Sequence, residues 1–146
     1  MTDKTHIVCP HCNATNRLPT IRLQDNPACG KCNKELFIGK PVDLNQQSFT
    51  QHISKNDIPV VVDFWAPWCG PCQSMAPAFV QAAAQLEPGV RLAKVDTEQQ
   101  QQLAGQYAIR SIPTLIIFKN GLEVNRQSGA MDANSMKQWI INAGNS

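Results

Sequence analysis

Six cysteines are the residues of this 146-residue chain that are best suited to chemistry, and they form three Cys-x-x-Cys pairs. The pairs are Cys9/Cys12, Cys29/Cys32 and Cys69/Cys72. Where thiols are kept reduced, this spacing indicates metal binding or redox catalysis and not structural disulfides. Residues 1–6 are polar, no apolar leader precedes the first cysteine, and every apolar run is too short to cross a bilayer. We therefore expect a cytoplasmic protein that is not in a membrane.

The third pair lies where a buried strand should pass into a helix. The β-branched run Ile58–Ala66 predicts the strand, and apolar residues recur at helical spacing from Cys72 to Leu86. Cys69 would then stand at a helix N-terminus, where free N–H groups and the helix dipole lower a thiol pKa from about 8.5 to about 7. The i, i+3 spacing brings both sulfurs within disulfide range, and Pro71 stiffens the turn without leaving a donor unpaired.

Asp63 lies within the apolar strand that precedes this pair. An ionised carboxylate is costly in such surroundings, so burial should raise the pKa of Asp63. A carboxylate of this kind can accept the proton of Cys72 when a mixed disulfide is resolved. The alternative interpretation is an aspartate that points into solvent from the strand end.

The other two pairs lie in a polar segment, residues 1–36, whose few apolar residues show no sustained periodicity. So short a segment needs a metal or covalent links to fold. Two Cys-x-x-Cys pairs separated by 16 residues predict a zinc-ribbon-like module. Its four thiolates (Cys9, Cys12, Cys29 and Cys32) would surround one zinc ion at about 2.3 Å. A redox-active or disulfide-bonded set, or iron, is the alternative, and His11 is interpreted as a bystander.

The rest of the chain alternates between strand and helix patterns, which predicts an α/β fold with a mixed sheet covered by helices on both faces. We divide the chain into a metal-binding module, 1–40, and a second domain, 41–146. The expected strands are Pro41–Leu44, Ile58–Ala66, Val90–Val95, Thr114–Lys119 and Leu122–Arg126. The expected helices are Gln46–Ile53, a helix from Cys72 kinked at Pro77, Glu98–Tyr107, and a last helix capped by Asp132. A net charge of +2 argues against a nucleic-acid partner.

Residues 41–146 resemble the thioredoxin family, whose fold the mixed sheet would adopt. The segment Trp68-Cys69-Gly70-Pro71-Cys72, with Asp63-Phe64-Trp65 before it and Pro77 after it, carries the resemblance. Ile112-Pro113-Thr114 matches the cis-proline segment of the family, and Gly129 matches the glycine beside the substrate groove. The resemblance implies that Cys69 attacks, that Cys72 resolves, and that Trp68, Ile112, Pro113 and Gly129 contact substrate. Lys94 resembles the lysine near the buried aspartate, whereas Pro67 and Gln73 depart from the common pattern.

The resemblance further implies a protein-disulfide reductase that serves electron transport and redox homeostasis. Its redox-active disulfide would be Cys69–Cys72, reduced in turn by NADPH-dependent thioredoxin reductase. Disulfide-containing proteins would be its clients, and the chain would act as a monomer. With the four-cysteine module in front, the whole chain resembles the thioredoxin 2 group of bacterial thioredoxins. The competing interpretations are a chaperone-like or adaptor module and a nucleic-acid-binding ribbon.

Overall fold

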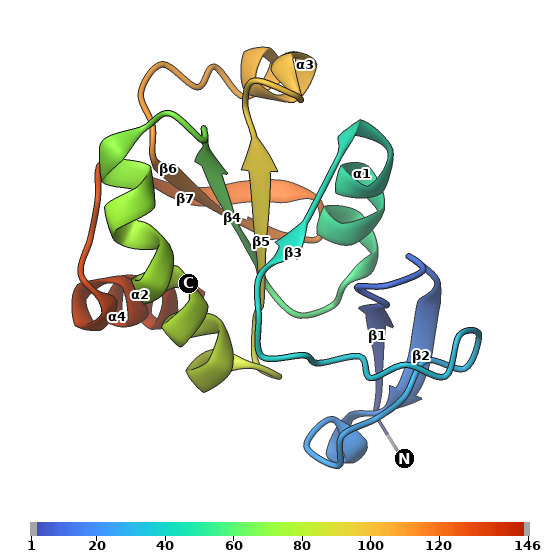
Figure 1. The fold of residues 1–146 in the computed structure, drawn as a ribbon. Coiled ribbons are helices and arrows are strands. Elements are labelled where there is room, and N and C mark those ends of the chain that lie inside the picture. The colour runs from blue at the N-terminus through green and yellow to red at the C-terminus, as the bar shows by residue number, and fades with distance from the viewer. Residues whose placement is uncertain (1–2, 145–146) are drawn as a thin grey trace.

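A small hairpin precedes a five-stranded sheet in the computed structural model, which describes residues 3–144 (Figure 1). The hairpin consists of β1 (Lys4–Val8) and β2 (Thr15–Pro19), which pair antiparallel, and a 3-10 turn (Thr20–Arg22) follows. No strand was expected here, because the apolar residues lack a strand period. Ile7 and Val8 are nevertheless fully buried, because the hairpin packs against the second domain.

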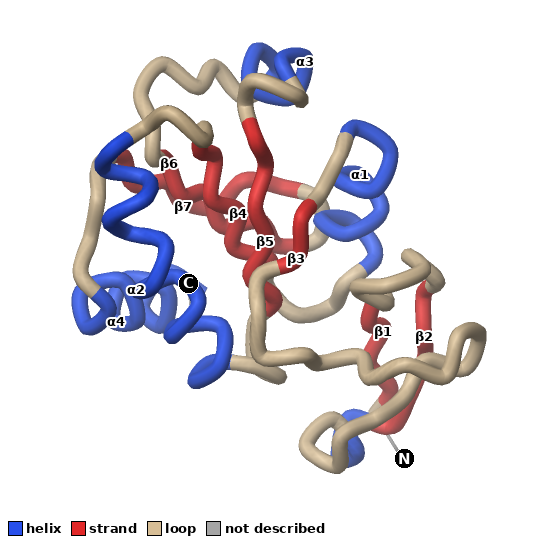
Figure 2. The backbone as a smooth tube through the Cα atoms, in the orientation of Figure 1, coloured by secondary structure: helices blue, strands red, loops and turns tan. Residues whose placement is uncertain are grey.

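The large sheet has the strand order β3-β5-β4-β6-β7. The strands β3 (Val42–Asp43), β5 (Arg91–Asp96) and β4 (Val60–Trp65) are mutually parallel, whereas β6 (Thr114–Lys119) and β7 (Leu122–Ser128) are antiparallel to their neighbours. The predicted mixed sheet is therefore confirmed, and Figure 2 shows it between helices. Within residues 3–144, no helix is long and apolar enough to span a membrane.

Helices cover the two faces of the sheet because successive strand residues point to opposite sides. One face packs against α1 (Gln46–Lys55) and α3 (Gln101–Gln106) through Phe49 and Leu103. The other face packs against α2 (Gly70–Leu86) and α4 (Ala133–Gly144) through Phe79 and Met136. In β4, Val62 and Val61 point to these two faces respectively. This packing fixes the end of β4, and with it the start of α2.

From β3 onward, the elements agree with the sequence prediction except near their ends. Asn120 and Gly121 both have positive φ (54° and 84°), as the hairpin between β6 and β7 requires. The Asp132 carboxylate accepts the Ser135 N–H at 2.8 Å and caps α4 as expected. The helix predicted from Glu98 begins only at Gln101. The Asp96 side chain binds the Glu98 N–H at 3.0 Å, and this local turn replaces the first helical residues.

We predict that Asn45→Ala lowers the free energy of unfolding by about 1 kcal/mol. Asn45 caps α1: its side chain accepts the Gln47 and Ser48 N–H groups at 2.9 Å, and the Ser48 hydroxyl accepts the Asn45 N–H at 3.0 Å. Urea unfolding measures the loss, with the exposed Gln102→Ala as control. Equal stability of the two variants would contradict the capping role.

Candidate functional site

Cys69 and Cys72 form a disulfide at the start of α2, with their Cα atoms 5.2 Å apart. Cys69 is the N-cap residue of the helix, and its sulfur accepts the Cys72 N–H at 3.2 Å. Pro71 occupies the first turn, where no N–H is needed. Both sulfur-bearing residues are almost buried, with exposed fractions of 4% and 3%. The helix N-terminus predicted for Cys69 is confirmed, and this setting favours a thiolate there once the disulfide is reduced.

The segment before β6 closes one side of the pair. The Cys69 sulfur lies 3.8 Å from the Ile112 carbonyl oxygen, and the Ile112–Pro113 peptide bond is cis. The Pro113 carbonyl accepts the Gly129 N–H at 2.8 Å, and Gly129 has a φ of +96°. The structure thus brings together Cys69, Ile112, Pro113 and Gly129, four residues that lie up to 60 positions apart in sequence.

Trp68 stands beside Cys69 with 67% of its surface exposed. Its indole N–H donates to the Glu98 carboxylate at 2.5 Å. From the other side, the Gln73 side-chain amide donates to the Pro67 carbonyl. Sequence reasoning does not single out Glu98, because its bond to Trp68 joins residues 30 positions apart. These two bonds hold the loop that carries Trp68 against α2 and against the turn before α3.

Asp63 is buried in β4, with 1% of its surface exposed and one carboxylate oxygen that no residue within 3–144 hydrogen-bonds. Its register partners are Lys94 of β5 and Leu115 of β6. Burial raises the pKa of Asp63 to about 7, and the Lys94 ammonium opposes this shift. The Lys94 nitrogen lies 4.2 Å from the centre of the Trp65 ring. The buried carboxyl group is thus suited to exchange a proton near neutral pH.

We predict that Asp63→Asn stabilises the fold at pH 8 by about 2–4 kcal/mol and leaves it unchanged at pH 4. The folded-state pKa of about 7 lies above the ordinary 3.8, so wild-type stability falls as pH rises between these values. The amide resembles the protonated acid and avoids this loss. Denaturant unfolding at both pH values measures it, and an equal difference at pH 4 and pH 8 would contradict the assignment.

The four remaining cysteines converge to a single cluster in the N-terminal module. All four sulfurs lie within 4.8 Å of one another. The Cys9–Cys32 and Cys12–Cys29 sulfur separations are 3.6 and 3.7 Å. Four sulfurs bound tetrahedrally at about 2.3 Å from one ion would be about 3.8 Å apart. The geometry fits a four-thiolate metal site.

Two identical turns present these ligands. In each turn the first cysteine N–H binds a carbonyl five residues on (Ala14 and Lys34), at 2.8 Å in both cases. The residue after the second cysteine is an asparagine with positive φ, 64° at Asn13 and 65° at Asn33. The shared Cys-x-x-Cys-Asn sequence was the signal for this repeat, and the spacing argument did not use the asparagines.

Hydrogen bonds and burial shift the pKa values of two of the four thiols in opposite directions. N–H donors, chiefly that of Cys32 with the Asn16 amide, lower the pKa of Cys29 to about 6. Burial raises the pKa of Cys9 to about 12. A bound cation would remove this penalty and allow all four sulfurs to ionise. His11 is not among the ligating groups: its Nε2 lies 3.1 Å from the Glu35 carbonyl oxygen, consistent with its interpretation as a bystander.

His6 and His52, to which the sequence assigned no role, lie between the two parts of the chain. His6 Nδ1 is 2.9 Å from the Asp57 carboxylate. His52 is fully buried on α1, and its Nε2 is 2.9 Å from the Asn13 side-chain oxygen. Burial, with a smaller effect of Arg91, lowers the pKa of His52 to about 4, so this imidazole is neutral at physiological pH.

Comparison with known proteins agrees with the site. Residues 40–142 match the family model of thioredoxin, and residues 8–34 match the model described as the N-terminal zinc ribbon of thioredoxin 2. Thioredoxin C-3 of Corynebacterium nephridii is 46% identical over 134 residues, which is 92% of each chain. Thioredoxin 1 of a Nostoc species is 45% identical over 97 residues, 66% of this chain and 91% of the relative.

A solved structure shows the same fold. A mutant thioredoxin from Halobacterium salinarum superposes with a TM-score of 0.66 at 34% identity, over 73% of this chain and 92% of that one. The mixed sheet, the helices on both faces and the disulfide at the start of α2 together make up the thioredoxin fold with its dithiol centre. The chain belongs to the thioredoxin family, as a thiol–disulfide oxidoreductase preceded by a zinc-ribbon-type module.

Proposed function

We propose that the chain reduces protein disulfides with Cys69 as the nucleophile and Cys72 as the resolving thiol. The Cys69 thiolate attacks one sulfur of the client disulfide, whose other sulfur leaves as a thiolate. The Cys72 thiolate then attacks the Cys69 sulfur, which releases the second client thiol and leaves the Cys69–Cys72 disulfide. Asp63 accepts the proton of Cys72 in this step. The position of Cys69 at the N-cap of α2, beside the Ile112 carbonyl, is the observation that carries the proposal.

The client chain would lie across the surface next to Cys69. The exposed Trp68 ring, the Ile112–Pro113 backbone and Gly129 form this surface, and the last three are connected by the Gly129–Pro113 hydrogen bond. Gly70 and Pro71 keep the turn between the two cysteines compact. An extended client backbone can approach Gly129 closely, because nothing within 4 Å would meet an added Cβ atom there.

Electrons would come from NADPH through thioredoxin reductase, which regenerates the dithiol after each turnover. The protein would work as a monomer in the cytoplasm, on disulfide-containing client proteins and without nucleic acid. Residues 1–40 would form a metal-binding module and residues 41–146 the catalytic domain. Four thiolates would hold one zinc ion in that module, as the sulfur separations of 3.6 and 3.7 Å support.

Reduction of insulin by NADPH and thioredoxin reductase tests the proposal. We expect turnover that requires both the reductase and this chain. The double variant Cys69→Ser, Cys72→Ser should show no turnover. In cells it should not confer the phenotype that the wild-type chain confers. A phenotype that survives in the double variant would identify an adaptor or holdase instead. Absence of NADPH-dependent turnover in the wild-type chain would contradict the proposal.

A further inference from the structure

The zinc-ribbon module is attached to the thioredoxin domain at the end of the sheet that is remote from the redox centre. Cys69 follows the carboxyl end of β4, whereas the module contacts Asp57 and Ile58, which precede β4, and Arg91, which begins β5 (Figure 1). Ile58 packs into the small apolar cluster of the module, beside Ile7 and Leu36. The module therefore has no core that is separate from the thioredoxin domain.

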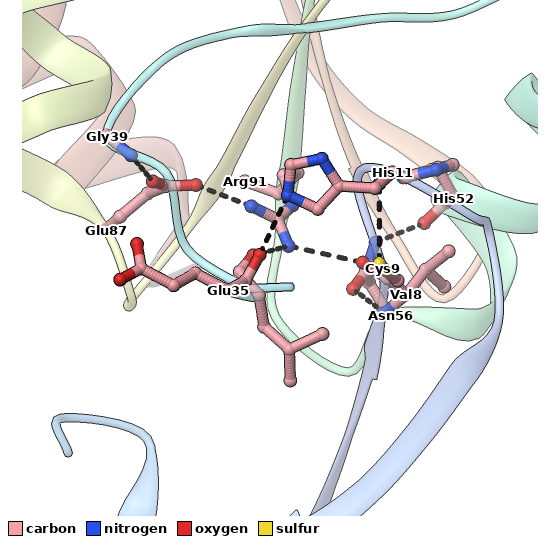
Figure 3. Close-up of polar contacts among 10 residues, drawn as sticks. Val8, Cys9, His11, Glu35, Gly39, His52, Asn56, Glu87 and Arg91 are labelled. Carbon is pink, nitrogen blue, oxygen red and sulfur yellow. Dashed lines mark hydrogen bonds and ion pairs between the residues drawn. The ribbon is translucent and has the colours of Figure 1, made fainter. Parts of the chain in front are cut away.

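Arg91 is the largest polar side chain within this contact, and it is completely buried. One terminal nitrogen of its guanidinium donates to the Glu87 carboxylate at 2.6 Å. The other donates to two carbonyl oxygens of the module, that of Val8 at 3.2 Å and that of Leu36 at 2.7 Å (Figure 3). Glu87 also accepts the Gly39 N–H at 2.8 Å. A buried guanidinium with these partners is positioned far more strictly than a surface arginine.

The two carbonyls belong to the two segments that flank the metal ligands. Val8 immediately precedes Cys9, and Leu36 follows the second pair of cysteines. The Leu36 N–H binds the Pro27 carbonyl at 3.0 Å, which joins the segments that enter and leave the second pair. Arg91 therefore holds together, from outside the module, the same two segments that a metal ion would hold together from inside.

Two further residues hold the backbone around the first pair of cysteines. They are His52 in α1 and Asn56, which directly follows that helix. The Asn56 side-chain oxygen accepts the Val8 N–H at 2.8 Å, so both backbone polar groups of Val8 bind side chains of the thioredoxin domain. His52 contacts Asn13, the residue directly after Cys12. Figure 3 shows these side chains gathered around Cys9. The backbone on each side of the Cys9/Cys12 pair is thus held by the thioredoxin domain.

We propose that Arg91, although it lies in the thioredoxin domain, is a positioning residue of the metal site and controls how firmly the module retains its metal. The proposal rests on the zinc site proposed above. Residues that orient metal ligands through hydrogen bonds commonly affect metal affinity 10- to 100-fold. Arg91 acts on the backbone next to Cys9, and its positive charge also faces a cluster that carries a charge of −2 when four thiolates hold one zinc ion. Loss of this contact would free the backbone on either side of the ligands and so weaken the hold on the metal.

The rate of zinc release to excess 4-(2-pyridylazo)resorcinol tests the proposal. We expect Arg91→Met to release zinc about 10- to 100-fold faster than the wild-type chain. Arg91→Lys keeps the charge but cannot bind Glu87 and both carbonyls together, so its rate should be intermediate. Arg110→Met, at an exposed arginine, is the matched control and should release zinc at the wild-type rate.

Met136→Ala controls for an effect of global destabilisation on zinc release. It opens a cavity beneath α4 and leaves the contact between Arg91 and the module intact. If Met136→Ala releases zinc as fast as Arg91→Met at matched stability, the proposal is overturned. If Arg91→Met does not fold, Asn56→Ala breaks the hold on Val8 from the other side and should also accelerate release. A folded Arg91→Met or Asn56→Ala protein with the wild-type rate overturns the proposal. Metal analysis of the wild-type chain comes first: absence of zinc there would refute the zinc site itself.

Discussion

Cys69→Ser loses disulfide reduction by on the order of 10³-fold or more, whereas Cys72→Ser forms a mixed disulfide with its client and stops there. The two cysteines differ because only Cys69 caps α2 and lies 3.8 Å from the Ile112 carbonyl. Cys72 lies in the first turn of α2, and its backbone N–H donates to the Cys69 sulfur at 3.2 Å. The first variant lacks the attacking thiolate, and the second lacks only the thiol that resolves the intermediate.

Mass spectrometry of each variant after incubation with an oxidised client protein measures this difference. We expect a covalent adduct with Cys72→Ser that dithiothreitol reverses, and none with Cys69→Ser. The double variant Cys69→Ser, Cys72→Ser, which keeps the four cysteines of the N-terminal module, is the control for reactions of those other thiols. Adduct formation through Cys72 in the Cys69→Ser variant would mean that the nucleophile has been assigned to the wrong cysteine.

Removal of the metal ligands produces the second large effect, which is confined to the N-terminal module. We predict that the double variant Cys29→Ser, Cys32→Ser binds no zinc and loses the β1–β2 hairpin. The buried apolar side chains of the module are few, chiefly Ile7 and Leu36, and cannot balance the entropy of ordering the segment. A structural zinc site supplies on the order of 10 kcal/mol, which is the contribution that the variant lacks.

Hydrogen exchange checks this prediction residue by residue. Amides of β1 and β2 should exchange rapidly in the variant, while those of β4 and β6 remain protected. The matched control is Cys69→Ser, Cys72→Ser, which should keep both the zinc and the hairpin. If β1 and β2 stay protected without metal, the contact with the thioredoxin domain is sufficient to fold the module, and the metal is not structural.

Much of the large sheet could be predicted from the sequence because its signals are local. The β-branched run in β4 and the Asn120-Gly121 turn each specify their own element. The position of Cys69 at the start of α2 was also predictable, from the change of strand to helix pattern. The two Cys-x-x-Cys pairs likewise predicted that four cysteines form one cluster. The pKa of Asp63 was also predictable in direction, since an acid within an apolar strand is buried whenever the strand is central.

The contact between the domains could not be predicted, because its partners are far apart in sequence and do not show a pattern. Arg91 and Val8 are 83 positions apart, and an arginine at the start of a strand ordinarily faces solvent. The hairpin β1–β2 was missed for a related reason. Its strands are short and mostly polar, and β1 is covered by residues of the other domain, such as Asn56 and Asp57. Glu98 was missed because its role depends on Trp68, 30 positions away.

The equilibrium reduction potential of the Cys69–Cys72 pair, measured in zinc-loaded protein against a thiol buffer, tests the central claim most directly. A reductase of the thioredoxin type should have a value of about −270 mV. At that potential the dithiol transfers electrons to most accessible client disulfides. A value of about −120 mV, typical of strong oxidants that share this fold, would mean that the protein introduces disulfides, and would contradict the proposed function.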